Sequence, residues 1–454
     1  MNEQYDLVII GAGPAGYIAA VESAGRGKKT ALIENRELGG TCLNRGCIPT
    51  KTILHSAQLY TQMKSCDHLG IHADHVSCDM AGIQAHKADV VLQLRYGIAS
   101  LMKKNRVTVY EGTGTILNPH EVSVGGAEPK ILTAEKILIA TGSVPSVPPI
   151  PGVDLPGVLD SDGLLCKTEV FPRLTIIGGG VIGMEFASVY SALGCKVTVI
   201  EFLDRILANM DKEISQNLKM ILKKRGVEIH TGARVEEILT GENGALICRY
   251  SEKDEMHLVE SDGILAAVGR KANTEGLFGD GMEVAMDRGK IIVNEFGQTS
   301  VENIYAAGDV TGKIQLAHAA SAQAVNAVAH MNGCEKILDT NLIPSCVYTD
   351  PEIGTVGITQ EQAKSEGLSV LVKKYPMSAN GKTVLTGQER GFIKVIADAD
   401  SHRILGAQMM CARATDMISE FGTAIVNGLT LEQMGTVVRP HPTFCEAISE
   451  AVRQ

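Results

Sequence analysis

A regular alternation of apolar runs and glycine-rich turns marks the first 34 residues of the chain. Residues 5–10 form an apolar run that predicts a short buried strand, and glycines crowd the turn at residues 11–16. Residues 17–26 then predict a helix, and residues 29–33 predict a second strand. That strand ends in a carboxylate, Glu34. The pattern predicts a strand, turn, helix and strand unit.

The same pattern recurs far downstream. A strand predicted at residues 174–177 leads into a glycine-rich turn at residues 178–183, then a helix, then a strand at residues 196–200 that ends in Glu201. In both copies the carboxylate lies 23 residues after the first glycine of the turn. The repeat indicates an internal duplication of one structural unit.

Each copy is followed by β-rich segments and a closing strand. We predict these strands at residues 107–110, 121–124 and 136–142 after the first copy, and at residues 227–230, 246–250 and 263–269 after the second. Prolines cluster between Pro145 and Pro156, so we place a domain boundary there. From about Asn341 the glycine motifs stop, and a strand at 392–396 with a helix at 415–427 predicts a separate α+β domain.

Composition narrows the function classes. With 454 residues the chain can form several domains, and a net charge of −10 argues against nucleic acid or an anionic membrane as a partner. No apolar run approaches the length of about 20 residues that a membrane span needs. The 11 cysteines are an odd and mostly scattered number without metal-ligand spacing, which is typical of a reducing compartment. We therefore expect a cytoplasmic protein that uses no metal ion and touches no membrane.

The two glycine turns carry the strongest chemical signal. A lone turn of this kind is weak evidence and can be an ordinary link between strand and helix, but here each has the strand, helix and distant acid of a dinucleotide-binding motif. Pyrophosphate would approach the helix N-terminus, and the acids would accept hydrogen bonds from ribose hydroxyls. The predicted residues are Gly11, Gly13, Gly16 and Glu34 in the first copy, and Gly178, Gly180, Gly183 and Glu201 in the second. Glu201 favours NAD over NADP, although the nearby cation Arg205 leaves NADP open.

Two cysteines, Cys42 and Cys47, come directly after the first copy. On a regular helix their Cα atoms would lie about 8.6 Å apart, and a disulfide tolerates no more than about 7 Å. Bridging them therefore requires an irregular turn, for which Gly46 and Pro49 are suited. The alternative is a pair of buried free thiols. Lys51, one helical turn after Cys47, favours the redox interpretation because a cation stabilises a thiolate or a reduced cofactor.

Near the C-terminus, His441 and Glu446 lie five residues apart. A carboxylate that orients an imidazole raises its basicity, as a general base acting on a thiol requires. On its own the motif is unspecific and is more typical of a surface histidine near the start of a helix. Cys445, inside the motif, is either a third redox thiol or a small packed residue.

Taken together, these motifs resemble the flavoprotein disulfide reductases, the pyridine nucleotide-disulfide oxidoreductases. The resemblance runs from end to end and rests on the segment Gly39 to Lys51, on Ala140-Thr141-Gly142, on the second glycine turn with Glu185, on Ala306-Ala307-Gly308-Asp309, and on His441 to Glu446. It implies an α/β fold with two Rossmann-like domains of the FAD- and NAD(P)-binding type and a C-terminal α+β dimerisation domain. The implied domains are residues 1–148 and 270–340 for FAD, 149–269 for NAD and 341–454 for the dimer interface.

The resemblance also assigns residues. It implies that Thr141, Gly142, Asp309 and Ala317 contact FAD, with Asp309 on the ribityl chain, that Gly269 belongs to the NAD site, and that Lys51 and Glu185 form an ion pair behind the flavin. Cys42 is expected to be the more exposed thiol and to exchange with substrate, while Cys47 faces the flavin. His441, oriented by Glu446, would move protons in the active site of a second subunit, so a homodimer is implied. Arg439 and Pro440 stand where the family often has a second histidine, so the surroundings of the base are expected to differ.

Within the family, the resemblance is greatest to enzymes that oxidise dihydrolipoamide with NAD. The lipoyl groups would be carried by a separate protein of a 2-oxo acid dehydrogenase, glycine-cleavage or acetoin complex. The alternatives are an NADPH-dependent reductase of glutathione or a related disulfide, and a non-catalytic redox sensor or scaffold. A mercuric or thioredoxin reductase is expected to have a cysteine pair at its extreme C-terminus, a transhydrogenase is expected to lack Cys42 and Cys47, and a sensor has no need of Cys42, Cys47, Lys51 and His441 together.

Overall fold

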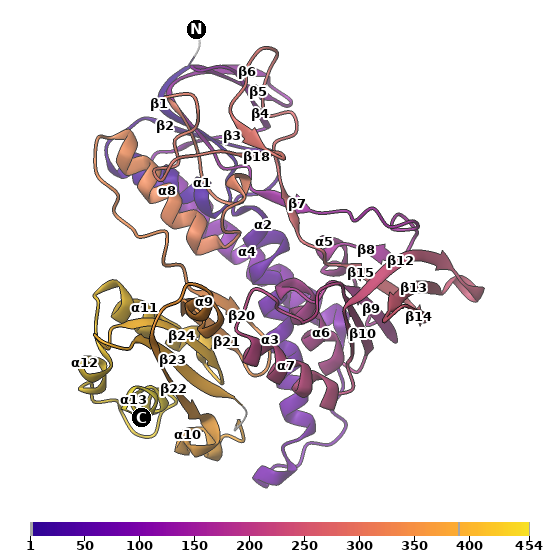
Figure 1. Cartoon of the computed structure of the whole chain (residues 1–454). Helices are drawn as coiled ribbons and strands as arrows, with labels where there is room; N and C mark the ends of the chain where they lie inside the picture. The colour runs from indigo at the N-terminus through magenta and orange to yellow at the C-terminus, as the bar shows by residue number, and fades with distance from the viewer. Residues whose placement is uncertain (1–2, 389–390, 454) are drawn as a thin grey trace.

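Three sheets organise the computed structural model, which describes residues 3–388 and 391–453 (Figure 1). The first sheet lies at the top of the view, the second at the right and the third at the lower left. This arrangement confirms the predicted fold class, two dinucleotide-binding units with a C-terminal α+β unit. No helix within the described ranges has the length and apolar character needed to cross a bilayer.

The first sheet is mixed. Its parallel part joins β3, β2, β1 and β6, β19 adds to β6, and β5 and β4 continue antiparallel. The strands are β1 (Glu3–Ile10), β2 (Thr30–Glu34), β3 (Thr108–Glu111), β4 (Thr113–Asn118), β5 (Glu121–Gly125), β6 (Lys130–Ile139) and β19 (Ile304–Ala306). Because β19 comes from a segment 165 residues after β6, the first unit is built from two separate parts of the chain.

Helices cover this sheet on one face. Helix α1 (Pro14–Gly25) packs along α8 (Ala317–Met331), and Figure 1 shows the indigo and orange helices side by side. Proline at the start of α1 suits a first turn, where its missing N–H costs nothing. Two helices, α3 (Cys47–Lys64) and α4 (Met80–Lys104), form a hairpin that extends from the first unit, with the short α2 (Gly40–Arg45) before it.

The second sheet is fully parallel, in the order β11, β10, β9, β15 and β8. Its strands are β8 (Val158–Leu159), β9 (Arg173–Ile177), β10 (Lys196–Glu201), β11 (Glu228–Thr231) and β15 (Gly263–Ala266), accompanied by α5 (Ser161–Leu164), α6 (Val181–Ala192) and α7 (Lys212–Lys224). An antiparallel meander adds β12 (Ala233–Thr240), β13 (Leu246–Glu252) and β14 (Glu255–Ser261). The strands and helices predicted for both copies are confirmed within a few residues at each end.

A two-stranded link joins the first two units. The chain leaves the first unit through β7 (Ser143–Pro145) and returns through β16 (Arg270–Ala272), and these two strands pair with each other. A further two-stranded ribbon, β17 (Met286–Asp287) with β18 (Lys290–Ile291), lies in the returning segment. The two crossings of the chain therefore lie side by side.

The third sheet is antiparallel, in the order β20, β21, β24, β23 and β22. Its elements are β20 (Ser345–Val347), β21 (Ile353–Gly357), β22 (Val370–Pro376), β23 (Phe392–Asp398) and β24 (Ile404–Met410), with α9 (Gln360–Ser365), α10 (Gly381–Leu385), α11 (Ala414–Val426), α12 (Leu431–Gly435) and α13 (Glu446–Arg453). Lys394, buried in β23, is bonded to Asp211 and Glu213 at the start of α7, so an ion cluster joins the third unit to the second.

Candidate active site

The two glycine turns have matching backbone geometry. Gly11 and Gly178 have φ angles of 100° and 111°, in the left-handed region that favours glycine. A Cβ atom on Gly11 would lie 2.3 Å from the carbonyl oxygen of Ala140, and one on Gly178 would lie 2.4 Å from that of Ala267. A side chain at either position would force the turn away from the closing strand of its sheet. Both glycines are therefore required by geometry.

Each turn leads into a helix with an open N-terminus. Gly13 and Gly180 are the N-cap residues of α1 and α6, and neither helix end has a side-chain cap. Both glycines border a cavity, so the first amide groups of these helices are available to a ligand there. Such a helix end binds phosphate because its N–H groups and its dipole favour negative charge. The structure thus fits a pyrophosphate at each turn.

The two predicted acids bind the backbone in the same way. Glu34 accepts hydrogen bonds from the N–H of Ala12 at 2.7 Å and of Arg36 at 2.9 Å. Glu201 accepts from the N–H of Gly179 at 2.5 Å and of Leu203 at 2.6 Å. Each carboxylate therefore clamps its glycine turn to the strand that ends at the acid. Both residues line the cavity, where a ribose hydroxyl could donate to their carboxylates.

One continuous cavity of about 2450 Å³ connects the two turns. A pocket for one small ligand typically has about 300 to 1,000 Å³, so this cavity has room for two dinucleotides. The predicted residues that line it are Gly11, Gly13, Glu34, Cys42, Cys47, Lys51, Thr141, Gly142, Gly178, Gly180, Glu185, Glu201, Gly269, Asp309 and Ala317. Gly16 and Gly183 lie behind their turns, against the carbonyl groups of Gly11 and Gly178. His441 and Glu446 are not part of this lining.

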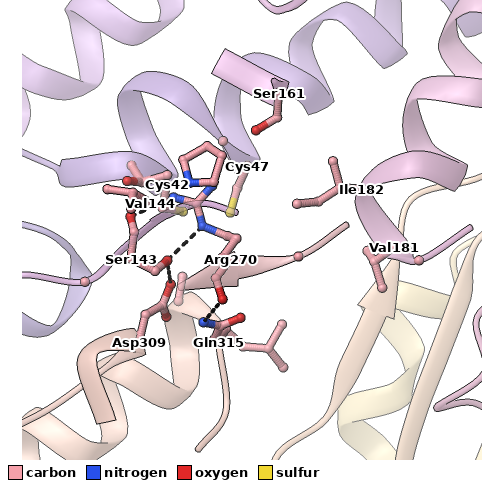
Figure 2. A pocket seen from close by; sticks show the side chains of 18 of the residues that line it. Cys42, Cys47, Ser143, Val144, Ser161, Val181, Ile182, Arg270, Asp309 and Gln315 are labelled. Carbon is pink, nitrogen blue, oxygen red and sulfur yellow. Dashed lines mark hydrogen bonds between the residues drawn. The ribbon is translucent and has the colours of Figure 1, made fainter. Parts of the chain in front are cut away.

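The cysteine pair sits where two helices meet at a break. Helix α2 ends at Arg45 and α3 begins at Cys47, with Gly46 between them. This interruption supplies the irregular turn that the spacing of Cys42 and Cys47 predicted, and Pro49 lies within the first turn of α3. Both cysteines are free thiols in the structure, which is the reduced form of the pair. Figure 2 shows the two side chains next to each other on one wall of the cavity.

The two thiols differ in acidity. The thiol of Cys42 donates to the sulfur of Cys47, and this bond, helped by the ammonium group of Lys51, lowers the pKa of Cys47 to about 7. The same bond, together with burial, raises the pKa of Cys42. Cys47 is therefore the thiolate of the pair, and Cys42 carries the proton.

The expected order of exposure is wrong. We expected Cys42 to be the more exposed thiol, but Cys42 is half-buried and Cys47 is exposed. The reason is that Cys47 is the first residue of α3 and its surface opens into the cavity, whereas Cys42 lies within α2.

Lys51 and Glu185 form the ion pair that the resemblance implied. The Nζ atom of Lys51 lies 2.7 and 2.9 Å from the two carboxylate oxygens of Glu185, which is only 5% exposed. Glu185 also accepts from the N–H of Tyr348 at 3.0 Å, and the centre of the Tyr348 ring lies 4.6 Å from the ammonium group. All three units of the chain therefore meet at this buried charge. Burial raises the pKa of the Tyr348 phenol to about 12, so the ring stays neutral beside the pair.

A polar chain surrounds Asp309. Ser143 donates to Asp309 at 2.6 Å, and Arg270 donates to the Ser143 hydroxyl at 2.8 Å, as Figure 2 shows. Burial raises the pKa of Asp309, while the bond from Ser143 and the charge of Arg270 oppose that rise. Asp309 therefore presents a hydrogen-bonding carboxyl group to the cavity, as a contact with the hydroxyls of a ribityl chain would need.

His441 and Glu446 form a hydrogen-bonded pair on the surface. The Nδ1 atom of His441 lies 2.9 Å from Glu446, and Glu446 also accepts from the N–H of Thr443 at 2.9 Å. Those two bonds lower the pKa of Glu446. The histidine side chain is 78% exposed and lies outside the cavity of its own chain. The structure thus keeps this pair apart from the cysteines of the same chain.

Arg439 anchors the segment that carries His441. Its side chain is only 4% exposed, donates to the hydroxyl of Ser449 at 2.6 Å, and forms an ion pair with Glu420 of α11. The predicted change in the surroundings of the base is therefore a buried cation that ties the segment to two helices. Cys445 is half-buried and packs against the core of the C-terminal unit, which supports its interpretation as a packed residue.

Sequence reasoning missed three residues that the structure brings to the site, namely Ser143, Arg270 and Tyr348. Ser143 comes directly after Thr141-Gly142, and Arg270 directly after Gly269, so adjacency to a predicted site residue was an available signal for both. Tyr348 lies 163 residues from Glu185, and no local motif marks it.

Comparisons with known proteins agree with this geometry. The family model described as pyridine nucleotide-disulphide oxidoreductase matches residues 5–324, and the model of its dimerisation domain matches residues 343–452. A dihydrolipoyl dehydrogenase of Bacillus subtilis (strain 168) is 42% identical to the chain and covers 99% of it and 98% of its own length. A mitochondrial dihydrolipoyl dehydrogenase of Pisum sativum is 38% identical, with 99% and 91% covered.

Solved structures show the same similarity. The HOCl-induced flavoprotein disulfide reductase RclA from Escherichia coli, in a Cu(II) complex, has a TM-score of 0.89 at 33% identity and covers 100% of this chain and 99% of its own. LpdA from Mycobacterium tuberculosis has a TM-score of 0.91 at 26% identity, with 99% of both chains covered.

Proposed function

Because the chain belongs to the pyridine nucleotide-disulphide oxidoreductase family, we propose that it is an FAD-dependent dihydrolipoyl dehydrogenase that reduces NAD. The observation that carries this proposal is the placement of Cys42 and Cys47 on the wall of the cavity that joins the two glycine turns. The relatives named as dihydrolipoyl dehydrogenases support the choice of substrate.

The proposed division of the chain corresponds to the two turns. Residues 1–148 and 270–340 bind FAD through Gly11, Gly13, Glu34 and Asp309, and residues 149–269 bind NAD through Gly178, Gly180 and Glu201. The matching open helix ends and backbone clamps support dinucleotide binding at both turns. A bound FAD would supply the two-electron acceptor for the dithiol and the hydride donor for NAD. The ion pair of Lys51 with Glu185 places a cation next to the Cys47 thiolate.

The cysteines perform the thiol exchange. In the oxidised enzyme, a dihydrolipoamide thiolate attacks the Cys42 sulfur of the disulfide and Cys47 leaves as thiolate. The second substrate thiol then attacks the mixed disulfide, so that lipoamide leaves with the new S–S bond and Cys42 keeps the electrons. A low pKa makes Cys47 the better leaving group, because thiols of low pKa leave faster.

His441 accepts the proton of the attacking substrate thiol, and Glu446 holds the ring for this task. The chain's own cysteines lie in a cavity that His441 does not line, so we propose a homodimer in which each subunit supplies its histidine to the other. The match to the dimerisation domain supports this assembly. The lipoyl groups belong to a separate protein of a multienzyme complex, and the scattered cysteines favour the cytoplasm.

A steady-state comparison tests the proposal. The holoenzyme is assayed with dihydrolipoamide and NAD, and in reverse with glutathione disulfide, thioredoxin disulfide and lipoamide, each with NADH and NADPH. We expect the lipoyl substrates with NAD or NADH to exceed every other pair in kcat/KM by orders of magnitude. A dominant rate with glutathione disulfide and NADPH would show that the enzyme is the alternative disulfide reductase.

A further inference from the structure

The loop after β10 contains a cation, Arg205, that should favour NADP over the proposed cofactor NAD. Arg205 lies four residues after Glu201, and both residues line the cavity. An arginine near the acid that binds the ribose is the usual means of accepting the 2′-phosphate of NADP. Its planar guanidinium group also binds phosphate through two parallel hydrogen bonds.

The guanidinium group of Arg205 is already occupied by a residue of another unit. Its Nη1 and Nη2 atoms lie 3.0 and 3.2 Å from the two carboxylate oxygens of Glu361, which is in α9 of the C-terminal unit. Nη2 also donates to the carbonyl oxygen of Ala208 at 3.1 Å. The geometry is the two-pronged one by which arginine would bind a phosphate.

The third nitrogen of the group is turned away from solvent. The Nε atom of Arg205 is buried and has no hydrogen-bond partner within the described ranges. A guanidinium group that serves only a surface ion pair has no need to bury a donor without a partner. The contacts with Glu361 and Ala208 therefore hold the guanidinium group, and Nε takes no part in them.

We propose that Glu361 determines the specificity for NAD by holding Arg205 away from the ribose of the dinucleotide. Two features of the chain then reject a 2′-phosphate. Glu201 repels it directly, and Glu361 withdraws the nearby cation that would attract it. The inference rests on the proposed NAD-linked function of the second unit and adds a residue 156 positions after Arg205 in the chain to the specificity of that unit.

The chain offers a matched control on the same short helix. Glu366 is the C-cap residue of α9 and is exposed, and no ion pair involves it in the described part of the chain. Glu361→Ala and Glu366→Ala each remove one negative charge from the same end of the C-terminal unit. Only the first releases Arg205. Because exposed ion pairs contribute little to stability, both variants should fold with FAD bound.

The test is calorimetric titration of each FAD-loaded protein with 2′,5′-ADP and with 5′-AMP, which differ only in the 2′-phosphate. In the wild type we expect 5′-AMP to bind more tightly. In Glu361→Ala we expect the ratio of the two Kd values to shift about tenfold toward 2′,5′-ADP, since one freed charge contact is worth about that factor. Glu361→Gln, which keeps a hydrogen-bond acceptor, should give a smaller shift in the same direction.

Removing the cation completes the test. In Glu361→Ala with Arg205→Met the shift should disappear, and Glu366→Ala should behave as the wild type. An unchanged ratio in Glu361→Ala, or a shift that persists without Arg205, would overturn the inference. A shift that is lost when Arg234→Met, which removes another cation of the cavity lining, is combined with Glu361→Ala would overturn it as well. Failure of the proposed function would be seen separately, as a wild type inactive with dihydrolipoamide and NAD.

Discussion

The two dinucleotide-binding units share their turns and differ in the segments that come after the turns. In both, a glycine with positive φ starts the turn and an open helix end comes next. A glutamate then accepts hydrogen bonds from one N–H of the turn and from one N–H just after its own strand. After Glu34 the chain enters the short helix that carries Cys42, and the pair with Cys47 lies beside the cavity. After Glu201 it enters a loop tied to the C-terminal unit through Arg205 and Glu361.

This difference separates binding from chemistry. The shared part of each unit provides a phosphate site and a ribose acceptor, and nothing in it transfers electrons. The redox group is added to the first unit alone. The second unit contributes Glu185 from α6, which pairs with Lys51 of the first unit and so joins its helix to the redox centre. Substitutions in the shared part should therefore change cofactor affinity, and substitutions at the redox centre of Cys42, Cys47, Lys51 and Glu185 should change chemistry.

The largest expected effect comes from Cys47→Ser. This change removes the thiolate of the first unit and leaves both glycine turns intact. We expect dihydrolipoamide turnover to fall by about 10⁴-fold or more, as for the loss of other catalytic nucleophiles, with FAD retained and NADH oxidation by an artificial dye largely kept. Steady-state rates and flavin absorbance check this outcome. Full lipoamide turnover would contradict the assignment of the pair.

His441→Gln should give the next largest effect, and only on the thiol half-reaction. The thiol half-reaction needs a base and hydride transfer to NAD does not, so we expect the first to slow by about 10²- to 10⁴-fold and the second to change little. Rapid-mixing measurements with dihydrolipoamide and with NADH separate the two half-reactions. His402, which also pairs with a glutamate at the surface, supplies the matched control His402→Gln, and this variant should leave both rates unchanged. Equal losses in both half-reactions would remove His441 from the role of thiol base.

Equivalent substitutions of the two glutamates should show which unit binds which cofactor. Each of Glu34→Ala and Glu201→Ala leaves two backbone N–H groups without their acceptor, a loss worth about 1 to 3 kcal/mol. We expect Glu34→Ala to weaken FAD retention by about tenfold or more and to spare the KM for NAD. Glu201→Ala should leave FAD bound and raise the KM for NAD. It should also narrow the preference for NAD over NADP by about tenfold, which corresponds to the free energy given above. Ultrafiltration and the ratio of kcat/KM values measure the two effects, and a crossed result would contradict the assignment of cofactors to units.

Lys51→Met should have the smallest effect, on the pH dependence of the thiolate. The pKa of Cys47 is lowered to about 7, chiefly by the hydrogen bond from Cys42 and further by the charge of Lys51. Removing that charge raises the pKa, so the thiolate forms at higher pH and alkylation by iodoacetamide at pH 7 should slow several-fold. Mass spectrometry of Cys47 in the dithiol-reduced holoenzyme measures the rate against pH. Lys64→Met, at the exposed end of the same helix, is the control. A second variant combines Lys51→Met with Glu185→Gln, so that no buried carboxylate is left without its partner. A pH profile that does not move would exclude Lys51 as a cause of the low pKa.

The sequence predicted the shared parts of the two units well. Glycine turns, apolar strands and the distant acids are local patterns set by backbone sterics and burial, so the strands, helices and fold class can be read from them. The break at Gly46 could be predicted from the distance that the cysteines must span.

The sequence did not reveal what the units add to each other. The contacts of Tyr348 with Glu185 and of Glu361 with Arg205 join residues 163 and 156 positions apart, and they depend on how the units pack rather than on a motif. The exposure of Cys42 and Cys47 was reversed for the same reason, because it depends on the shape of the cavity between the units. The hairpin of α3 and α4 was not predicted, since beyond the start of α3 no chemical motif marks these two helices.

The central claim is that dihydrolipoamide delivers electrons through Cys42 and Cys47 to a flavin held by the first unit. Anaerobic titration of the purified holoenzyme with dihydrolipoamide, monitored by visible absorbance, tests it most directly. We predict that the wild type shows a flavin spectrum and develops a long-wavelength band from the Cys47 thiolate beside the flavin, and that Cys47→Ser develops none. A protein with no flavin absorbance, or a wild type in which dihydrolipoamide produces no such band, would contradict the account.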